Sequence, residues 1–293
     1  MQHKFKGLGV AMVTPFLVDG NVDFPGLTSL TEYLIKGGVD YLVVQGTTGE
    51  SATMNLTEKQ EVLEHVKKIN AGRLPLVFGH GGNNTAALVE GFNDFNWEGV
   101  DAILSASPYY NKPTQEGIYQ HYKALNEATP RPIIVYNVPG RTSSNITAAN
   151  TLCMANDFEN VVAIKEASGD LAQISEIIKF RPEGFLVLSG DDPLVVPHIS
   201  IGGDGVISVI GNALPKTFST MVHQALNEDF VNARKMHLRL LDGIDMLFAE
   251  GNPAGIKAAL KSKGICGDMV RLPLVNVSQE LYEMIESEME DLG

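Results

Sequence analysis

The sequence has little cysteine and a shortage of positive charge. Its two cysteines, Cys153 and Cys266, form no C-x-x-C pair and make no disulfide framework, so we expect a reducing, cytosolic setting. Lys and Arg number 22 against 35 Asp and Glu, which gives a formal net charge of −13 among 293 residues. This charge argues against nucleic acid or an anionic membrane as a partner, because both require clustered cations.

Long apolar runs are also missing. No uninterrupted stretch approaches the roughly 18 apolar residues of a membrane-spanning helix. Residues 7–18 are apolar and faintly resemble a signal peptide, but Pro15 and Asp19 interrupt the run and no A-x-A-like cleavage site follows. We therefore interpret this stretch as a buried first strand. No low-complexity linker divides the chain, so we expect one packed body.

Several catalytic signatures are absent. The chain has no G-x-x-x-x-G-K-[ST], no G-x-S-x-G and no H-E-x-x-H, and its seven histidines show no metal-ligand spacing. Asp191-Asp192 favours a polar loop over a cation site, because no third ligand is visible. Residues 79–83 (GHGGN) resemble an esterase oxyanion loop, but the chain lacks the matching nucleophile elbow. No metal site is predicted.

Short apolar runs rich in β-branched residues recur along the first 210 positions. None alternates with polar residues, which is typical of parallel strands buried on both faces. Amphipathic segments such as 57–69 and 170–180 lie between them and predict helices. The eight runs are 9–13, 40–44, 74–78, 101–105, 132–136, 161–165, 185–189 and 205–210.

Eight strand-then-helix repeats predict an α/β fold, a closed (β/α)₈ TIM barrel over residues 1–225. A doubly wound sheet is disfavoured, because no G-x-G-x-x-G follows the first strand. Residues 226–293 contain no comparable strand and predict a C-terminal helical appendage packed on the barrel. Its expected helices are 227–248, 253–263 and 278–291.

A barrel of this kind carries its active residues at the carboxyl ends of its strands. Lys165 follows four apolar residues at such an end, and Tyr136 ends the neighbouring strand. A desolvated lysine can attack a ketone to form an imine, and a nearby tyrosine can relay protons. A structural or phosphate-binding lysine and an ordinary aromatic remain open from position alone.

Two further groups at this end of the barrel suit anions. Thr47 and Thr48, flanked by glycines, offer hydroxyls and backbone N–H groups to a carboxylate or equally to a phosphate. Arg141 follows the fifth strand and can grip a carboxylate or phosphate with two hydrogen bonds, or form a surface salt bridge.

Six motifs give these residues a common context, because in their order they resemble the dihydrodipicolinate synthase family. This family belongs to the pyruvate-dependent class I aldolases, which include N-acetylneuraminate lyase. As a set the motifs are specific, and they extend through most of the chain. They are GTTGES (46–51), SPYYNKPTQEG (107–117), YNVPGRT (136–142), IKEASGD (164–170), LSGDD (188–192) and GVISV (205–209).

The resemblance implies four catalytic residues. Lys165 is expected to form the Schiff base with pyruvate, and Tyr136 to donate and accept protons. Thr47 and Tyr110 are expected to complete the proton relay, with Tyr110 reaching in from a neighbouring subunit of a homotetramer built from dimers. The chemistry implied in this way uses neither a metal nor an organic cofactor.

The resemblance also implies four substrate-binding residues. Thr48 and the main chain of Ile207 are expected to contact pyruvate, Arg141 to bind the carboxylate of L-aspartate 4-semialdehyde, and Gly190 to line the pocket. The implied reaction condenses these two substrates to 4-hydroxy-tetrahydrodipicolinate, the first committed step of the diaminopimelate route to lysine.

Three alternative functions fit these residues less well. A sugar-acid aldolase such as N-acetylneuraminate lyase shares the lysine and tyrosine, but typically lacks an arginine at position 141 and has serine at position 47. A non-catalytic keto-acid-binding barrel is expected to lose the lysine or the tyrosine. A phosphate-binding isomerase needs a glycine-rich loop after the seventh and eighth strands, whereas Gly202-Gly203 precedes the eighth.

The sequence departs from lysine-inhibited members of the family at three positions. Leu56 and Lys59 stand where those members commonly have histidines, and Ala87 stands where they have a glutamate. Alanine cannot pair with the ammonium group of a bound lysine, and Lys59 adds a like charge. We expect inhibition by lysine to be weak or absent.

Overall fold

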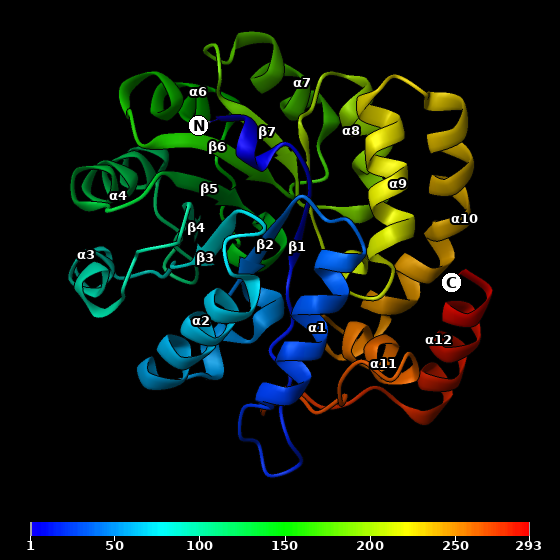
Figure 1. Cartoon of the computed structure of the whole chain (residues 1–293). Helices are drawn as coiled ribbons and strands as arrows, with labels where there is room; N and C mark the ends of the chain where they lie inside the picture. Colours follow the sequence, from blue (N-terminus) through cyan, green and yellow to red (C-terminus); the bar gives the residue numbers. More distant parts are fainter. Residues whose placement is uncertain (1, 293) are drawn as a thin grey trace.

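Eight parallel strands close into a barrel in the order β1 to β8, as a computed structural model describing residues 2–292 shows (Figure 1). The predicted (β/α)₈ barrel is therefore confirmed. The strands are β1 (Gly7–Ala11), β2 (Tyr41–Val44), β3 (Leu76–Gly79), β4 (Ala102–Ala106), β5 (Ile133–Asn137), β6 (Val161–Glu166), β7 (Leu186–Ser189) and β8 (Gly205–Ser208).

The strand ends differ from the expected runs for identifiable reasons. β1 begins two residues earlier than predicted, because Gly7 pairs with Gly205 of β8. β8 was expected to reach residue 210 but ends at Ser208. The next two N–H groups, of Val209 and Ile210, donate instead to the carboxylate of Asp192 at 2.9 and 2.8 Å.

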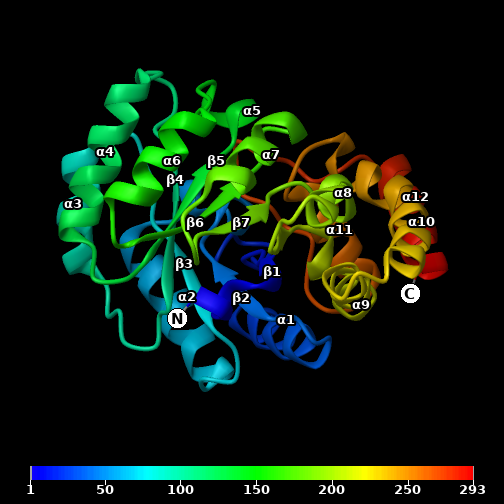
Figure 2. The same cartoon turned by 90° about the horizontal axis from the view of Figure 1, so that it is seen from above.

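Helices surround the barrel on its outer face (Figures 1 and 2). The predicted helix 57–69 is α2, but it begins at Leu56, because Asn55 is its N-cap. The Asn55 side chain accepts from the N–H of Glu58, whose carboxylate accepts from the N–H of Asn55. The barrel helices are α1 (Phe24–Lys36), α2 (Leu56–Asn70), α3 (Thr85–Gly91), α4 (Gln115–Ala128), α5 (Pro139–Thr142), α6 (Ala148–Asp157), α7 (Leu171–Phe180), α8 (Val195–Ser200) and α9 (Pro215–Leu226).

Three helices follow: α10 (Phe230–Ala249), α11 (Ala254–Ser262) and α12 (Gln279–Leu292). α10 begins at Phe230 and not at 227, because Asp229 caps it by accepting from the N–H of Asn232. Helix 253–263 was expected to place Pro253 inside its first turn, but Pro253 occupies the cap position. α10 packs against α9, and α10 and α12 lie farthest from the strands (Figure 2). The division into units at residue 225 stays a prediction.

The barrel interior is a packed apolar layer that forms the floor of the site. It includes Tyr41, Val77, Ile134, Leu188 and Ile207, all fully buried. Within residues 2–292, no helix is long and apolar enough to cross a membrane.

Candidate active site

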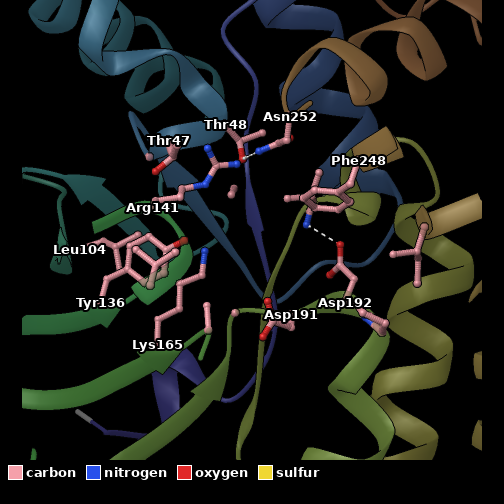
Figure 3. Close-up of a pocket in the computed structure, with 18 of the residues that line it drawn as sticks. Thr47, Thr48, Leu104, Tyr136, Arg141, Lys165, Asp191, Asp192, Phe248 and Asn252 are labelled. Carbon is pink, nitrogen blue, oxygen red and sulfur yellow. Dashed lines mark hydrogen bonds between the residues drawn. The ribbon is translucent and has the colours of Figure 1, made fainter. Parts of the chain in front are cut away.

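Lys165 and Tyr136 lie side by side at the carboxyl ends of β6 and β5, where they are partners in the strand register. The Lys165 Nζ lies 4.3 Å from the centre of the Tyr136 ring (Figure 3). Both side chains are shielded from water, with 5% and 7% of their surface exposed. An amine and a phenol are thus held together in a sheltered place, an arrangement suited to nucleophilic and proton-transfer chemistry.

A cavity of about 220 Å³ opens above this pair. Six of the eight predicted site residues line it: Thr47, Thr48, Tyr136, Arg141, Lys165 and Gly190. The residues come from the ends of four different strands, β2, β5, β6 and β7, but meet at one mouth, as the barrel geometry requires.

Thr47 and Thr48 belong to a short 3₁₀ turn, Thr47–Gly49, directly after β2. Non-glycine residues in the left-handed region flank this turn, Gln45 at φ 61° and Glu50 at φ 54°. Such backbone conformations are unfavourable and persist only where surrounding contacts impose them. Here Thr14 donates its hydroxyl to the Gly49 carbonyl at 2.7 Å, and the Asn252 side chain donates to Thr48 Oγ1 at 3.0 Å (Figure 3).

Arg141 stands on α5 at the rim, between this cavity and an adjoining one. Its side chain is exposed, and the part of the chain that the structure describes gives it no ion-pair partner. The surface salt bridge left open by the sequence is therefore not formed there. The guanidinium remains available to an incoming anion.

Gly190 leaves room for the lysine. A Cβ at this position would lie 2.6 Å from the Ala167 Cβ and 3.1 Å from the Lys165 Cε. The Gly190 N–H donates to the Glu166 carbonyl at 2.7 Å, which holds the β7 end close against β6. A larger residue could not occupy this position without displacing the lysine or the strand end.

Two predicted site residues do not line the cavity. Tyr110 is 90% exposed and lies in the left-handed region at φ 72°, and it lines neither this cavity nor the adjoining one. Ile207 is fully buried within β8, one of the strands that form the packed floor. Their expected roles stay predictions.

Asp191 and Asp192, which the sequence predicts only as a polar loop, both line the cavity. Burial raises the pKa of Asp191, and the nearby Lys165 charge opposes that rise. Asp192 is the acceptor that ends β8, and burial raises its pKa as well. Their position after β7 was a usable signal, whereas the contacts with β8 were not visible in the sequence.

Glu166 faces away from the cavity and holds a buried polar cluster behind it. Its carboxylate accepts from the Asn137 amide at 3.0 Å, the Ser168 N–H at 2.8 Å and the Gln173 amide at 3.0 Å. Burial raises the pKa of Glu166, and these hydrogen bonds oppose that rise. The cluster ties the ends of β5 and β6 together, and so fixes the spacing of Tyr136 and Lys165.

The C-terminal part of the chain also reaches the cavity, through α10 and the loop that follows it. The residues, which no motif indicated, are Ile244, Asp245, Phe248 and Asn252. Across residues 4–292, no three or more His, Cys, Asp or Glu side chains gather closely enough to hold a metal ion.

The fold and the site define the class of protein: a (β/α)₈-barrel enzyme whose reactive groups centre on a buried lysine at the carboxyl end of a strand. The sequence model of the Dihydrodipicolinate synthetase family matches residues 4–292, and the chain belongs to this family.

Relatives and solved structures agree over almost the full length. A protein of Azobacteroides pseudotrichonymphae named 4-hydroxy-tetrahydrodipicolinate synthase is 51% identical over 285 residues, 97% of this chain and 96% of the relative. One of Flavobacterium psychrophilum with the same name is 50% identical over 282 residues, 96% of each. The crystal structure of dihydrodipicolinate synthase from Thermotoga maritima has a TM-score of 0.96 at 38% identity and covers 99% of both chains.

Proposed function

We propose that this chain is a lyase that condenses pyruvate with L-aspartate 4-semialdehyde to give 4-hydroxy-tetrahydrodipicolinate, the first committed step of the diaminopimelate route to lysine. The observation that carries the proposal is the Lys165–Tyr136 pair, buried in a cavity that also presents threonine hydroxyls and a free guanidinium. Relatives of the same name at about half identity over the full length support the choice of substrates.

The first half of the reaction uses the lysine amine. The Lys165 Nζ adds to the C2 carbonyl of pyruvate, the carbonyl oxygen leaves as water, and an iminium forms. The iminium draws electrons, so a C3 methyl proton leaves and an enamine results. Tyr136, in contact with the lysine, is the residue we assign to move these protons, together with Thr47, which lines the same cavity.

The second half forms the carbon–carbon bond. The enamine carbon attacks the aldehyde of the semialdehyde, whose oxygen takes a proton and becomes the 4-hydroxyl. The amino group of the semialdehyde then attacks C2, which closes the ring and releases the Lys165 amine. The product retains every atom of the two substrates except one oxygen and two hydrogens, which leave as one water.

Two anion-binding groups line the mouth and suit two carboxylates. We assign the pyruvate carboxylate to the buried Thr48, with the main chain of Ile207 as a second contact. We assign the semialdehyde carboxylate to Arg141, because its exposed position at the rim suits the substrate that enters second. Gly190 keeps the space that the lysine needs between these groups.

Tyr110 is proposed to act in a neighbouring subunit. Its 90% exposure and its unfavourable φ of 72° support a side chain held outward for a second copy of the chain. A two-fold pair lets each subunit complete the other's relay, and we propose a homotetramer built from such pairs. Two free cysteines suit the reducing cytoplasm that we propose as its location.

The substrates are tested by steady-state assay of the purified chain. Pyruvate with L-aspartate 4-semialdehyde should give the cyclic product, and omission of either substrate should abolish it. Cleavage of N-acetylneuraminate should be slow or absent. Strong cleavage of that sugar acid, without condensation, would favour the sugar-acid aldolase instead.

A further inference from the structure

An ion pair shut off from water joins the C-terminal helices to the threonine turn of the site. Lys257, on α11, donates to the carboxylate of Glu50, and the two side chains are 0% and 1% exposed. The Lys257 Nζ also donates to the Met269 carbonyl at 2.7 Å. Lys257 does not line the cavity, so it stands behind the site and not in it.

Glu50 fixes the turn from both its side chain and its main chain. Its second carboxylate oxygen accepts from the Arg271 N–H at 2.9 Å. Its own N–H donates to the Thr47 carbonyl at 3.0 Å and closes the turn. Because Glu50 is held at φ 54°, a conformation that non-glycine residues avoid, its side-chain bonds impose the backbone direction at the end of the turn.

The same C-terminal segment makes a second contact with the turn. Asn252 donates to Thr48 Oγ1 at 3.0 Å, so the hydroxyl oxygen is already used as an acceptor. The hydroxyl proton is then free to be donated toward the cavity. The Phe16 ring packs against both cations of this cluster, with the Lys257 Nζ 4.3 Å and the Arg271 guanidinium 4.2 Å from the ring centre.

A buried ion pair is seldom the most stabilising choice for a core, since apolar side chains of similar size serve as well. Here the ion pair serves instead to fix the position of one short turn, Thr47–Gly49. We propose that Lys257 is a positioning residue: through Glu50 it fixes the turn that presents Thr47 and Thr48, and the C-terminal helices thereby set the affinity for the first substrate. This inference rests on the proposed function, in which that substrate is pyruvate.

The test compares Lys257→Met and Glu50→Gln with the unaltered enzyme. Imine formation is followed without the second substrate, as borohydride-dependent inactivation at increasing pyruvate. Displacement of the turn should raise the pyruvate concentration for half-maximal trapping about 10- to 100-fold, the cost of misplacing a binding group by about 1 Å. The kcat/KM for the semialdehyde should change far less than that for pyruvate.

Two matched controls separate positioning from general stability. Lys261→Met removes an exposed lysine one turn farther along α11, which pairs with Asp268. Glu58→Gln breaks the ion pair that joins Arg271 of the C-terminal segment to α2, outside the turn. Both controls should keep the pyruvate dependence of the unaltered enzyme, even where the melting temperature falls.

The double variant Glu50→Gln with Lys257→Met leaves no unpaired buried charge, and it serves if Lys257→Met alone does not fold. It should recover the melting temperature without recovering the pyruvate dependence. Normal pyruvate dependence in Lys257→Met or in the double variant, or an equal loss in Glu58→Gln, would overturn the positioning role. Absence of pyruvate trapping in the unaltered enzyme would instead overturn the proposed function, and this inference with it.

Discussion

Gly190→Ala is the substitution whose effect the structure defines most closely. The added methyl group would lie 2.6 Å from the Ala167 Cβ, 3.1 Å from the Lys165 Cε and 3.2 Å from the Glu166 carbonyl oxygen. The 2.6 Å contact with the Ala167 Cβ can be relieved only if the strand end shifts, which the hydrogen bond from the Gly190 N–H resists. The 3.1 Å contact also displaces the flexible lysine side chain, so the reactive amine moves in either case.

The cost has two parts. Overpacking of this size destabilises a folded protein by about 1–3 kcal/mol, which corresponds to a fall of several degrees in Tm. A displacement of the reactive amine by about 1 Å lowers its rate roughly 100-fold. We expect Gly190→Ala to remain folded and to lose about 100-fold in kcat/KM for pyruvate.

The assay is steady-state turnover at varied pyruvate, with thermal unfolding on the same samples. Gly140→Ala is the control, since a Cβ at Gly140, on the same rim, meets nothing within 4 Å. The control should resemble the unaltered enzyme in both measurements. Unchanged kcat/KM in Gly190→Ala would refute the argument that this glycine makes room for the lysine.

Three further predictions concern substrate choice, regulation and pH. Arg141→Ala should lower kcat/KM for the semialdehyde more than for pyruvate, with a loss of about 2–4 kcal/mol in transition-state binding. An equal fall in kcat/KM for both substrates would make Arg141 a structural residue. Lysine should inhibit weakly, with half-inhibition above about 1 mM, because Lys59 and Ala87 line a cavity of about 210 Å³ without the expected glutamate; strong inhibition below that concentration would contradict this. The hydrogen bond of His223 to Asp40 at 2.8 Å raises the pKa of His223 above its ordinary 6.5. The stability that this hydrogen bond adds is complete below pH 6.5 and is lost as pH rises through the raised pKa of His223. Thermal unfolding should therefore show His223→Gln to be less stable than the unaltered chain near pH 6, by about 0.5 kcal/mol or less for this half-exposed pair, and equally stable near pH 9. A difference that stays constant with pH would refute the pairing.

The barrel was predictable because each buried parallel strand is visible in the sequence as a short apolar run. Strand ends were less predictable, because side chains distant in sequence decide them. Asp192 accepts hydrogen bonds from the N–H groups that would have extended β8, and the Asn212 side chain accepts from the Val13 N–H just beyond β1. Such hydrogen bonds depend on tertiary structure and leave no periodic pattern in the sequence.

The site divides in the same way. Lys165 and Tyr136 were identified because they stand at strand ends in recognisable motifs, and the register places them together. No sequence signal placed Asn252 and Lys257 at the site, because they contact the threonine turn from more than 200 residues away in the sequence. The proposed role of Tyr110 in a second subunit depends on contacts between two chains, which the structure of one chain does not contain.

The proposed chemistry depends on a covalent imine between Lys165 and pyruvate. Trapping with borohydride in the presence of pyruvate, followed by peptide mass mapping, detects this imine. We expect the mass of one reduced pyruvate adduct per chain, on the peptide that contains Lys165, and no adduct in Lys165→Ala or Lys165→Arg. An adduct on another lysine, or full turnover by Lys165→Ala, would contradict it.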